Sequence, residues 1–396
     1  MITRGWVRAV VLAAVGLIAL AAAVWLWTAF RTSDDHLPPG AYEPLADPRW
    51  EVAADDAKGV REDALARARV WREPADPIDR ADLTRNPGDG GRLDPTPPIA
   101  CKFLPRATRG TTPKFDCILP GGEVIKVKYG GTPENYAEVA ASRLLAALGF
   151  GADRMDLVAR VRCFGCPISP FHAYQALELV RMDEAYTRRI DYSHYRDFEW
   201  PAVERRFPAA SVDTPEVKGW AFYELEKIDP ARGGSSRAHV DALRLMAAFL
   251  HHWDNKAENQ RLVCLAAPAP GGPNGPCPQP FAFVQDLGST FGPKKVSFES
   301  WSTRRLWSDA ATCELNMKDM PYAGATFGTV RIKEAGRRFL ADELQQLSEV
   351  QIRALFTAAR FPEYHSRRDP GADVANWVRA FQQKVREIAD RAPCPA

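Results

Sequence analysis

The sequence predicts an α+β protein built from two lobes. Between residues 99 and 180, short apolar runs with period-2 patterning alternate with turn residues and are interrupted by one helical pattern. After residue 217 the apolar residues recur mainly at helical spacing. Strands with one helix, followed mostly by helices, are typical of an α+β fold. A chain of 396 residues is long enough to bury a full-sized core.

The first thirty residues predict a membrane anchor. Arg4 and Arg8 precede residues 9–30, which carry no charge and as a helix would be roughly 33 Å long, enough to span a bilayer core. Positive charge before this run and Asp34 and Asp35 after it place the N-terminus in the cytoplasm. A cleaved signal peptide is the alternative, but the run is longer than a typical h-region and no A-x-A site ends it. We therefore expect residues 1–30 to be a cytoplasmic stub and transmembrane signal anchor, and the remainder to be periplasmic or otherwise extracytoplasmic.

The cysteines agree with an oxidising compartment, because there are eight of them, an even number. Eight cysteines allow 105 pairings, and sequence alone does not choose among them. The local pairs that we expect are Cys101 with Cys117 across neighbouring strands, Cys163 with Cys166, and Cys264 with Cys277 across a loop, which leaves Cys313 for Cys394. The alternative is a zinc site made of Cys163, Cys166 and two other cysteines.

Residues 31–99 are rich in Pro, Asp and Arg and poor in large apolar residues. One helix is expected there, at about 58–71, and the breaker cluster at 86–91 follows it. This segment is predicted to be a tether with some ordered packing and no chemistry of its own. The whole chain has 52 Lys and Arg against 50 Asp and Glu, so nothing in its charge favours nucleic acid.

The segment from residue 99 predicts an antiparallel meander and a helix. Strands are expected at 101–104, 114–119 and 123–129, the last two joined by the turn Pro120-Gly121-Gly122. Thr132 can cap the following helix, Pro133 suits its first position, and Gly149 its end. The later elements expected are strands at 154–162, 173–180, 262–265 and 281–284, a hairpin tip at 163–166, and helices at 217–228, 235–251, 341–360 and 372–389.

A candidate catalytic motif follows the helix predicted at 235–251. Asp254 and Asn259 stand five residues apart, a spacing that suits phosphoryl transfer: the Asp accepts a proton from an attacking hydroxyl and the Asn binds the metal. With His252 they fill the fixed positions of H-R-D-x-x-x-x-N, and Trp253 replaces the Arg. Adjacent histidines on a helix point about 100° apart, so we do not expect His251 and His252 to share a metal.

The partners that this motif requires occur elsewhere, in the order that kinases have. Lys128 ends a predicted strand and Glu138 lies in the next helix, which matches a lysine–glutamate pair that holds phosphates. Lys126 points to the same side as Lys128 and Glu134 lies one turn before Glu138, so both remain alternatives. Asp286-Leu287-Gly288 ends a predicted strand and matches the metal-binding D-F-G motif with Leu for Phe.

Residues from about 101 to 293 resemble an atypical protein-kinase-like domain, of the HipA-like, phosphoinositide-kinase-like and secretory-pathway kinase groups. The pattern Glu-x-x-x-x-x-x-Leu-x-x-x-Gly of the family helix is matched from Glu138 to Gly149, and residues 286–292 resemble the D-F-G-x-x-F-G run of phosphoinositide kinases. The resemblance implies a two-lobed kinase-like fold behind the transmembrane helix. Its N-lobe would be residues 100–182, a small antiparallel sheet plus one helix, and its mainly helical C-lobe residues 183–396.

The resemblance also implies ATP and Mg²⁺ as cofactors and a role for each matched residue. The roles implied are phosphate contact for Lys128 or Lys126, orientation of the lysine for Glu138, the base for Asp254, metal binding for Asn259 and Asp286, nucleotide cover for Arg109, Gly110, Thr111 and Thr112, and the hinge beside the adenine for Glu178, Leu179 and the residues up to Arg181. The covering loop departs from the family pattern, because it has one glycine in place of G-x-G-x-x-G.

These features predict a membrane-anchored, outward-facing atypical kinase that transfers the ATP γ-phosphate to a hydroxyl of a protein, glycan or lipid. One physical objection is that ATP is scarce outside a bacterial cytoplasm. The alternative is therefore a catalytically silent kinase-fold protein (a pseudokinase) that acts as a ligand-binding or envelope interaction module. A third reading is an envelope structural protein whose Asp and Asn residues cap turns.

Overall fold

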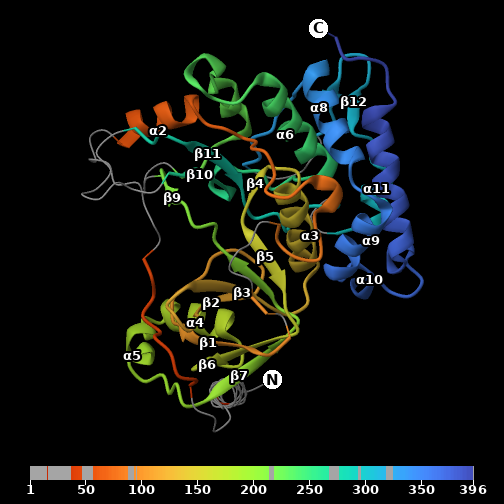
Figure 1. Cartoon of the computed structure of the whole chain (residues 1–396). Helices are drawn as coiled ribbons and strands as arrows, with labels where there is room; N and C mark the ends of the chain where they lie inside the picture. Colours follow the sequence, from red (N-terminus) through yellow and green to blue (C-terminus); the bar gives the residue numbers. More distant parts are fainter. Residues whose placement is uncertain are drawn as a thin grey trace, which may run out of the picture. The chain divides into compact units, whose positions relative to one another are not determined.

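The computed structural model describes residues 16, 37–46, 57–87, 93–94, 96–213, 218–266, 276–292, 296–317 and 324–395. Their elements confirm the α+β class (Figure 1). The anchor predicted at residues 9–30 lies, apart from Gly16, outside these ranges. Within them, no helix combines the length and the apolar character that a bilayer crossing needs.

The chain forms two compact units. Unit 1 comprises residues 1–45, 94–130 and 158–201, and unit 2 comprises residues 46–93, 131–157 and 202–396. The boundary predicted between the lobes, at residue 182, differs from this division, because residues 131–157 belong to unit 2.

Unit 1 contains the predicted meander. Strands β1 (Ile99–Leu104), β2 (Lys114–Ile118) and β3 (Val124–Lys128) pair antiparallel in sequence order. On the other side of β1 lie β6 (Arg160–Phe164), parallel to it, and then β7 (Tyr195–Glu199), antiparallel to β6. The strand predicted at 154–162 is two strands, since β5 (Arg154–Leu157) is separate from β6 and pairs with β8 (Ala202–Arg205) in unit 2. No tight hairpin turns at 163–166, because β6 pairs with a strand that begins at Tyr195.

The strand predicted at 173–180 is wrong. This segment lies in α4 (Pro170–Leu179), followed by the short α5 (Asp183–Thr187). Pro170 occupies the first turn of α4, where a missing N–H costs nothing, and Phe171 and Tyr174 bury one helical face. A short, mostly apolar segment fits a strand or a helix, and the buried side chains here are spaced as on one helical face.

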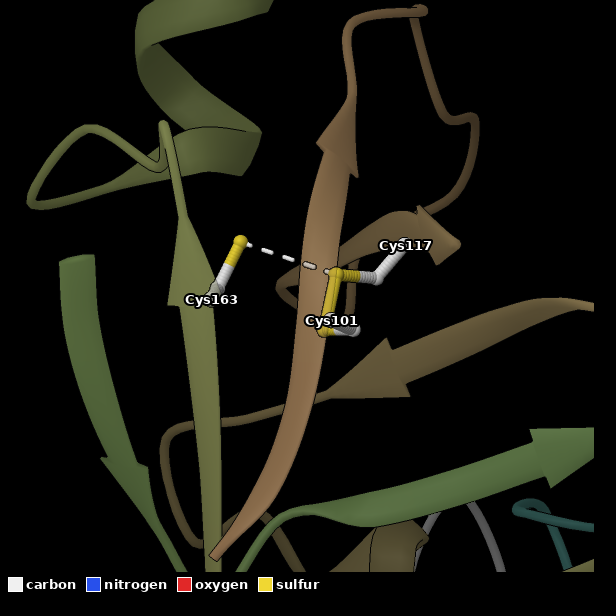
Figure 2. A group of neighbouring side chains, drawn as sticks. All are labelled: Cys101, Cys117 and Cys163. Atoms are coloured by element: carbon white, nitrogen blue, oxygen red, sulfur yellow. Dashed lines mark hydrogen bonds between the residues drawn. A yellow bond between two sulfur atoms is a disulfide. The ribbon is translucent and has the colours of Figure 1, made fainter. Parts of the chain in front are cut away.

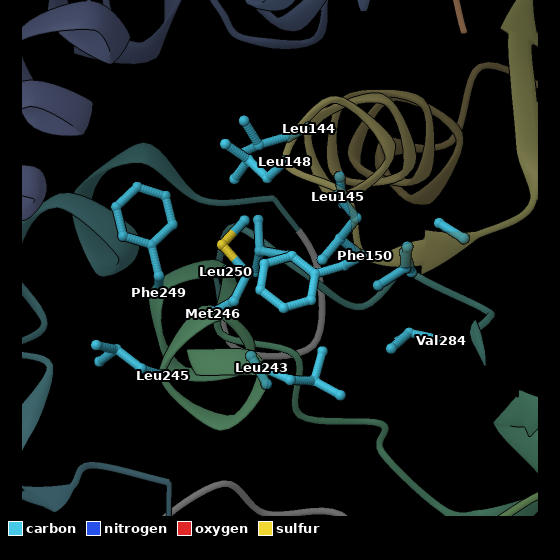
Figure 3. Packing of buried hydrophobic residues seen from close by; sticks show 14 of the residues in the cluster. Leu144, Leu145, Leu148, Phe150, Leu243, Leu245, Met246, Phe249, Leu250 and Val284 are labelled. Carbon is cyan, nitrogen blue, oxygen red and sulfur yellow. The ribbon is translucent and has the colours of Figure 1, made fainter. Parts of the chain in front are cut away.

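Unit 2 is built around α3 (Pro133–Ala147) and α6 (Arg237–Leu250). Thr132, Pro133 and Gly149 delimit α3 as predicted. Figure 3 shows Leu144, Leu145 and Phe150 in the same buried cluster as Leu243 and Met246 of α6. The remaining long helices are α8 (Glu334–Gln345), α9 (Glu349–Ala358) and α11 (Val374–Ala389). The helix predicted at 341–360 is therefore divided between α8 and α9, where Ser348 caps α9 by accepting from Gln351 N.

A four-stranded sheet in unit 2 has the order β4-β11-β10-β9. Its strands are β4 (Gly151–Ala152), β9 (Ala210–Ser211), β10 (Gln260–Cys264) and β11 (Pro280–Val284). Strands β10 and β11 are antiparallel with Gln260 opposite Val284, and β4 is parallel to β11 with Ala152 opposite Val284. The strands predicted at 262–265 and 281–284 are thus neighbours.

Residues 57–87 are part of the unit 2 core. Helix α2 (Ala57–Ala66) ends five residues earlier than predicted, and its Leu65, together with Leu83, is fully buried. Arg61 of α2 forms a buried ion pair with Glu224 at 2.9 Å. The helix predicted at 217–228 is a 3-10 helix, η3 (Phe222–Lys227). The other short elements are η2 (Ile78–Arg80), η4 (Pro230–Arg232), η5 (Ala257–Asn259), α7 (Phe298–Thr303), β12 (Trp307–Asp309), β13 (Glu314–Leu315), α10 (Phe361–Tyr364) and η6 (Pro370–Ala372).

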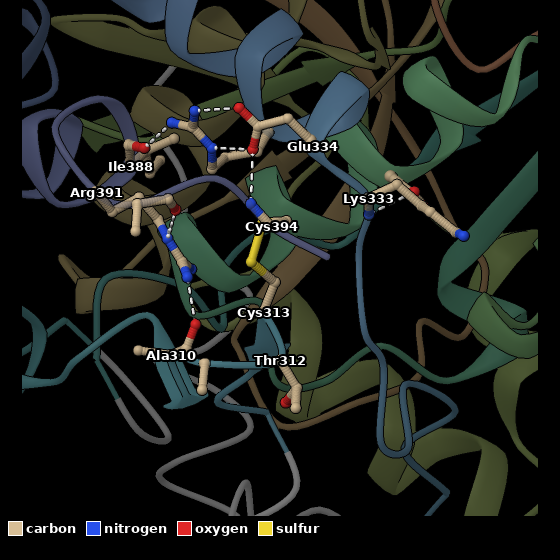
Figure 4. The surroundings of a disulfide bond; sticks show 12 residues. Ala310, Thr312, Cys313, Lys333, Glu334, Ile388, Arg391 and Cys394 are labelled. Carbon is tan, nitrogen blue, oxygen red and sulfur yellow. Dashed lines mark hydrogen bonds and ion pairs between the residues drawn. A yellow bond between two sulfur atoms is a disulfide. The ribbon is translucent and has the colours of Figure 1, made fainter. Parts of the chain in front are cut away.

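All eight cysteines lie in the described ranges and form disulfides. The pairs are the predicted ones: Cys101–Cys117, Cys163–Cys166, Cys264–Cys277 and Cys313–Cys394. The last bridge is surrounded by polar contacts, including the Cys394 N–H that donates to Glu334 at 2.8 Å (Figure 4).

The zinc alternative is wrong. The sulfur atoms of Cys101, Cys117 and Cys163 lie within 4.8 Å of one another (Figure 2). Each of them is already bonded to another sulfur, so none is a thiolate that could bind zinc.

Candidate active site

The candidate catalytic motif lies between the end of α6 and the start of β10. Helix α6 ends at Leu250, where His251 takes a left-handed conformation with φ of 56° and turns the chain out of the helix. Residues 252–256 form an irregular loop, and η5 leads into β10 at Gln260. The motif therefore has a buried helix before it and a central strand after it, which are rigid supports for a site.

Asp254 lies in this loop with only 13% of its side chain exposed. Its Oδ1 atom is buried and has no hydrogen-bond partner, and the nearest cation, Lys256 Nζ, is 3.6 Å away. Burial raises the pKa of Asp254 above its usual value, and the negative charge of Asp286 adds to the rise, while Lys256 and Asn259 oppose it. An unsatisfied carboxylate oxygen with raised basicity suits a group that accepts a proton.

Asn259 connects this loop to the neighbouring strand. Its Nδ2 donates to the carbonyl oxygen of Asp254 at 2.9 Å, and its own carbonyl accepts from the Gln285 N–H at 3.0 Å. The second bond continues the β10–β11 ladder by one step beyond the pair Gln260 and Val284. Asn259 is thereby fixed between the proposed base and the end of β11.

Asp286 stands two residues after β11, with an exposed side chain and a left-handed backbone, φ 50°. Its charge acts on both Asp254 and His252. The structure therefore brings Asp254, Asn259 and Asp286 together.

The residues after Asp286 are packed tightly. Leu287 is buried in the core, and its carbonyl accepts from the Thr290 hydroxyl at 2.7 Å. A Cβ at Gly288 would lie 3.1 Å from the Cβ of Glu134, so this position suits glycine. The Phe291 N–H donates to the Leu250 carbonyl at 2.7 Å, which ties the segment to the end of α6.

Asn255 organises this loop from inside, and no sequence pattern indicated it. It is 1% exposed, and its Nδ2 donates to the His252 carbonyl at 2.9 Å. Its Oδ1 accepts from the N–H groups of Thr326 and Phe327 at 2.7 and 3.1 Å. The partner segment is about seventy residues away in the sequence, so no local pattern indicates it. His252 is also buried, and burial lowers its pKa to about 4, so it is neutral at physiological pH and supports the loop without charge.

A second support comes from residues 219–224. Gly219 has φ of 61°, and a Cβ there would overlap the carbonyl oxygen of Ala257 in η5. The Trp220 indole N–H donates to the Arg261 carbonyl at 3.3 Å. Arg61 of α2 donates to the Gly219 carbonyl at 2.7 Å, so α2 contributes to the support of this loop.

The remaining predicted residues are divided between the two units. Lys128 is 3% exposed at the end of β3, and Lys126 is half-buried opposite Asp116 on β2. Glu138 is 4% exposed in α3, which belongs to unit 2, so its pairing with Lys128 of unit 1 stays a prediction. Burial of a lysine or a glutamate to this degree is rare without a partner.

The predicted covering loop and hinge both lie in unit 1. Arg109, Gly110 and Thr111 are exposed in the connection between β1 and β2, where the covering loop was expected. Glu178 and Leu179 end helix α4, and Leu179 is 85% exposed. The hinge was expected at the end of an extended segment, and the structure has a helix there.

Unit 2 offers oxygen ligands that suit a hard divalent cation. Asp286 provides a carboxylate and Asn259 an amide oxygen. Magnesium prefers one or two carboxylates together with substrate phosphates, which fits this donor set.

No protein-family model matches this sequence, and no curated protein matches it. Among solved structures, the chain is similar to the crystal structure of a Helicobacter pylori proinflammatory kinase, CtkA. The two are 11% identical, the match covers 74% of this chain and 94% of that chain, and the TM-score is 0.39.

Proposed function

We propose that this chain is an ATP- and magnesium-dependent kinase that transfers the γ-phosphate to a hydroxyl of a protein, glycan or lipid. One observation carries the proposal: Asn259 donates to the Asp254 carbonyl and accepts from the N–H of Gln285, the residue before Asp286, and the charge of Asp286 acts on Asp254. Phosphoryl transfer requires a proton acceptor and metal-binding oxygens in this proximity.

Asp254 would orient the acceptor hydroxyl and accept its proton. Its Oδ1 is available, because no hydrogen-bond donor of the described residues occupies it. The raised pKa of Asp254, caused first by burial, makes the carboxylate a stronger base than an exposed aspartate. Lys256 lies close enough to Asp254 to stabilise negative charge on the transferred group.

Asn259 and Asp286 would hold the magnesium ion, which when bound supplies neutralising charge to the phosphates. Lys128, or Lys126 in its place, would contact phosphate, and Glu138 would orient that lysine. Residues 109–111 would cover the nucleotide.

The location that we propose is outside the cytoplasm, behind an N-terminal membrane anchor. The four disulfides support it, since disulfides persist in oxidising compartments. The same observation favours a second candidate, a catalytically silent module that binds a ligand in a kinase-like site, because little ATP is present outside a bacterial cytoplasm.

Two measurements on the purified full-length protein separate these candidates. The first is the shift of the unfolding temperature by ATP with and without Mg²⁺; no shift of the wild-type protein under either condition would refute nucleotide binding. The second is the conversion of bound ATP to ADP. If the protein binds ATP but does not convert it to ADP with any of the hydroxyl acceptors supplied, the silent module is favoured.

A further inference from the structure

Asp153 is a buried carboxylate next to the proposed metal-binding segment. It lies between β4 and β5 and is 6% exposed. Its Oδ1 accepts from the Phe207 N–H at 3.1 Å and lies 3.9 Å from Arg261 Nη1. Its Oδ2 accepts a short hydrogen bond from the side-chain amide of Gln285.

The sheet explains why Asp153 meets Gln285. Strand β4 runs parallel to β11 with Ala152 opposite Val284. The next residue on each strand is Asp153 on one side and Gln285 on the other, so the register places the two side chains next to each other. Gln285 in turn immediately precedes Asp286.

We infer that Asp153 is a positioning residue for the metal ligands, acting through Gln285. This inference rests on the proposed function, and it adds the residue that fixes the metal-binding segment in place. Asp153 holds the Gln285 side chain, and the Gln285 N–H donates to the Asn259 carbonyl at 3.0 Å. A displacement of Gln285 would therefore reach both proposed ligands, one through the peptide bond and the other through this hydrogen bond.

Asp286 needs such support because of its backbone. Its φ of 50° lies in the left-handed region, which is strained for a residue with a side chain and persists only where the surroundings impose it. Leu287 on one side is buried in the core, and Gln285 on the other side is held by Asp153. The strained residue is thus fixed between two anchored neighbours.

A purely structural role would look different in one respect. Asp153 also satisfies the Phe207 N–H and faces Arg261, and both contacts stabilise the fold whether or not a metal binds. A structural role lowers the stability of the variant and leaves its metal affinity unchanged. If Asp153 has a positioning role, its loss lowers the metal affinity, and rebuilding the contact with residue 285 restores that affinity.

The experiment is a titration of full-length protein with Mn²⁺ in the presence of a non-hydrolysable ATP analogue, with free Mn²⁺ read by electron paramagnetic resonance. Asp153→Asn should raise the half-saturating Mn²⁺ concentration about tenfold or more, the effect typical of residues that orient metal ligands. The double variant Asp153→Asn, Gln285→Glu reverses donor and acceptor and should return it to within about threefold of wild type.

The matched control is Asp241→Asn. Asp241 is 2% exposed in the same unit, and its polar contacts within the described ranges are with the Lys333 N–H at 3.1 Å and with Arg244 at 3.6 Å. It should lower the unfolding temperature while leaving Mn²⁺ affinity unchanged.

Wild-type affinity in Asp153→Asn would overturn the inference, and so would an equal loss in Asp241→Asn or a reversed pair that restores nothing. Failure of the proposed function is a distinct result, because it appears in the wild-type protein as an absence of Mn²⁺–nucleotide binding, and the inference falls with it.

Discussion

The side-chain amide of Asn259 donates a 2.9 Å hydrogen bond to the carbonyl oxygen of Asp254. This contact joins a proposed metal ligand to the proposed base. The Asn259 main-chain carbonyl accepts in turn from the Gln285 N–H, so the loop and the end of β11 share one hydrogen-bond network. Substitutions in this network should therefore affect metal binding and proton transfer separately.

Asp286→Ala should abolish the magnesium-dependent part of nucleotide binding. A ligand at about 100 times its Kd stabilises the folded state by about 2.7 kcal/mol, and the variant should lose most of this gain. The measurement is the unfolding temperature with ATP at increasing Mg²⁺. The matched control is Glu258→Ala, an exposed acid in η5 that should keep the full shift. A full shift in Asp286→Ala would contradict the assignment.

Asp254→Asn should bind Mg²⁺ and ATP but transfer phosphate slowly. The amide has the shape of the carboxylate but does not accept the proton, and loss of a general base typically lowers a rate by about 10²–10⁴-fold. ATP turnover at saturating nucleotide measures the effect. A rate within threefold of wild type would exclude Asp254 as the base.

Asn255→Ala should destabilise the protein by about 2–4 kcal/mol. The substitution removes the acceptor of the Thr326 and Phe327 N–H groups and leaves those donors without a partner in a largely buried position. Unfolding by denaturant measures the loss. Thr326→Ser keeps the hydroxyl that donates to the Asn255 carbonyl and should lose less than about 1 kcal/mol. Equal losses in the two variants would show that this hydrogen-bond set does not hold the loop.

Features encoded by neighbouring residues could be predicted from the sequence. Thr132, Pro133 and Gly149 delimit α3 because capping depends on a few consecutive positions. The meander could be predicted in the same way, because the turn Pro120-Gly121-Gly122 joins one run of alternating residues to the next. Asp254, Asn259 and Asp286 could be found because their spacing and their order along the chain are themselves a signal.

Features that depend on distant contacts or on packing could not be predicted. Asn255 contacts Thr326 across 71 residues, and Arg61 contacts Glu224 across 163. Neither pair has a spacing that indicates it. Helix α4 was mistaken for a strand because its short apolar run fits both periods, and only the buried face decides between them.

Arg61→Ala should destabilise the protein by about 3–5 kcal/mol, although Arg61 lies in a segment that the sequence presented as a tether. The substitution leaves the carboxylate of Glu224 buried without its main partner and removes a bond to the Gly219 carbonyl. Denaturant unfolding measures the loss. Arg67→Ala, which breaks a more exposed ion pair with Asp63 on the same helix, should lose about 1 kcal/mol or less.

The same ion pair should make stability depend on pH in the acid range. Burial alone would raise the pKa of Glu224, but hydrogen bonds from Arg61 and the Ala221 N–H and the charge of Arg61 lower it from 4.5 to about 2. Because the folded-state value is the lower one, the contribution is complete above pH 4.5 and is lost as the pH falls toward 2. The difference in unfolding free energy between wild type and Glu224→Gln should shrink over that interval. A difference independent of pH would contradict this assignment.

The four disulfides should contribute unequally to stability. Cys313 and Cys394 are 81 residues apart, whereas Cys163 and Cys166 are 3 apart. Loop-closure entropy in the unfolded chain then predicts a loss of about 4.5 kcal/mol when the first pair is replaced by serine and about 1.6 kcal/mol for the second. The Cys394 N–H also donates to Glu334, so freeing the C-terminal segment removes a further contact. Denaturant unfolding of the two double variants measures both losses. Equal losses would show that the long bridge acts on a loop already closed by other contacts in the unfolded state.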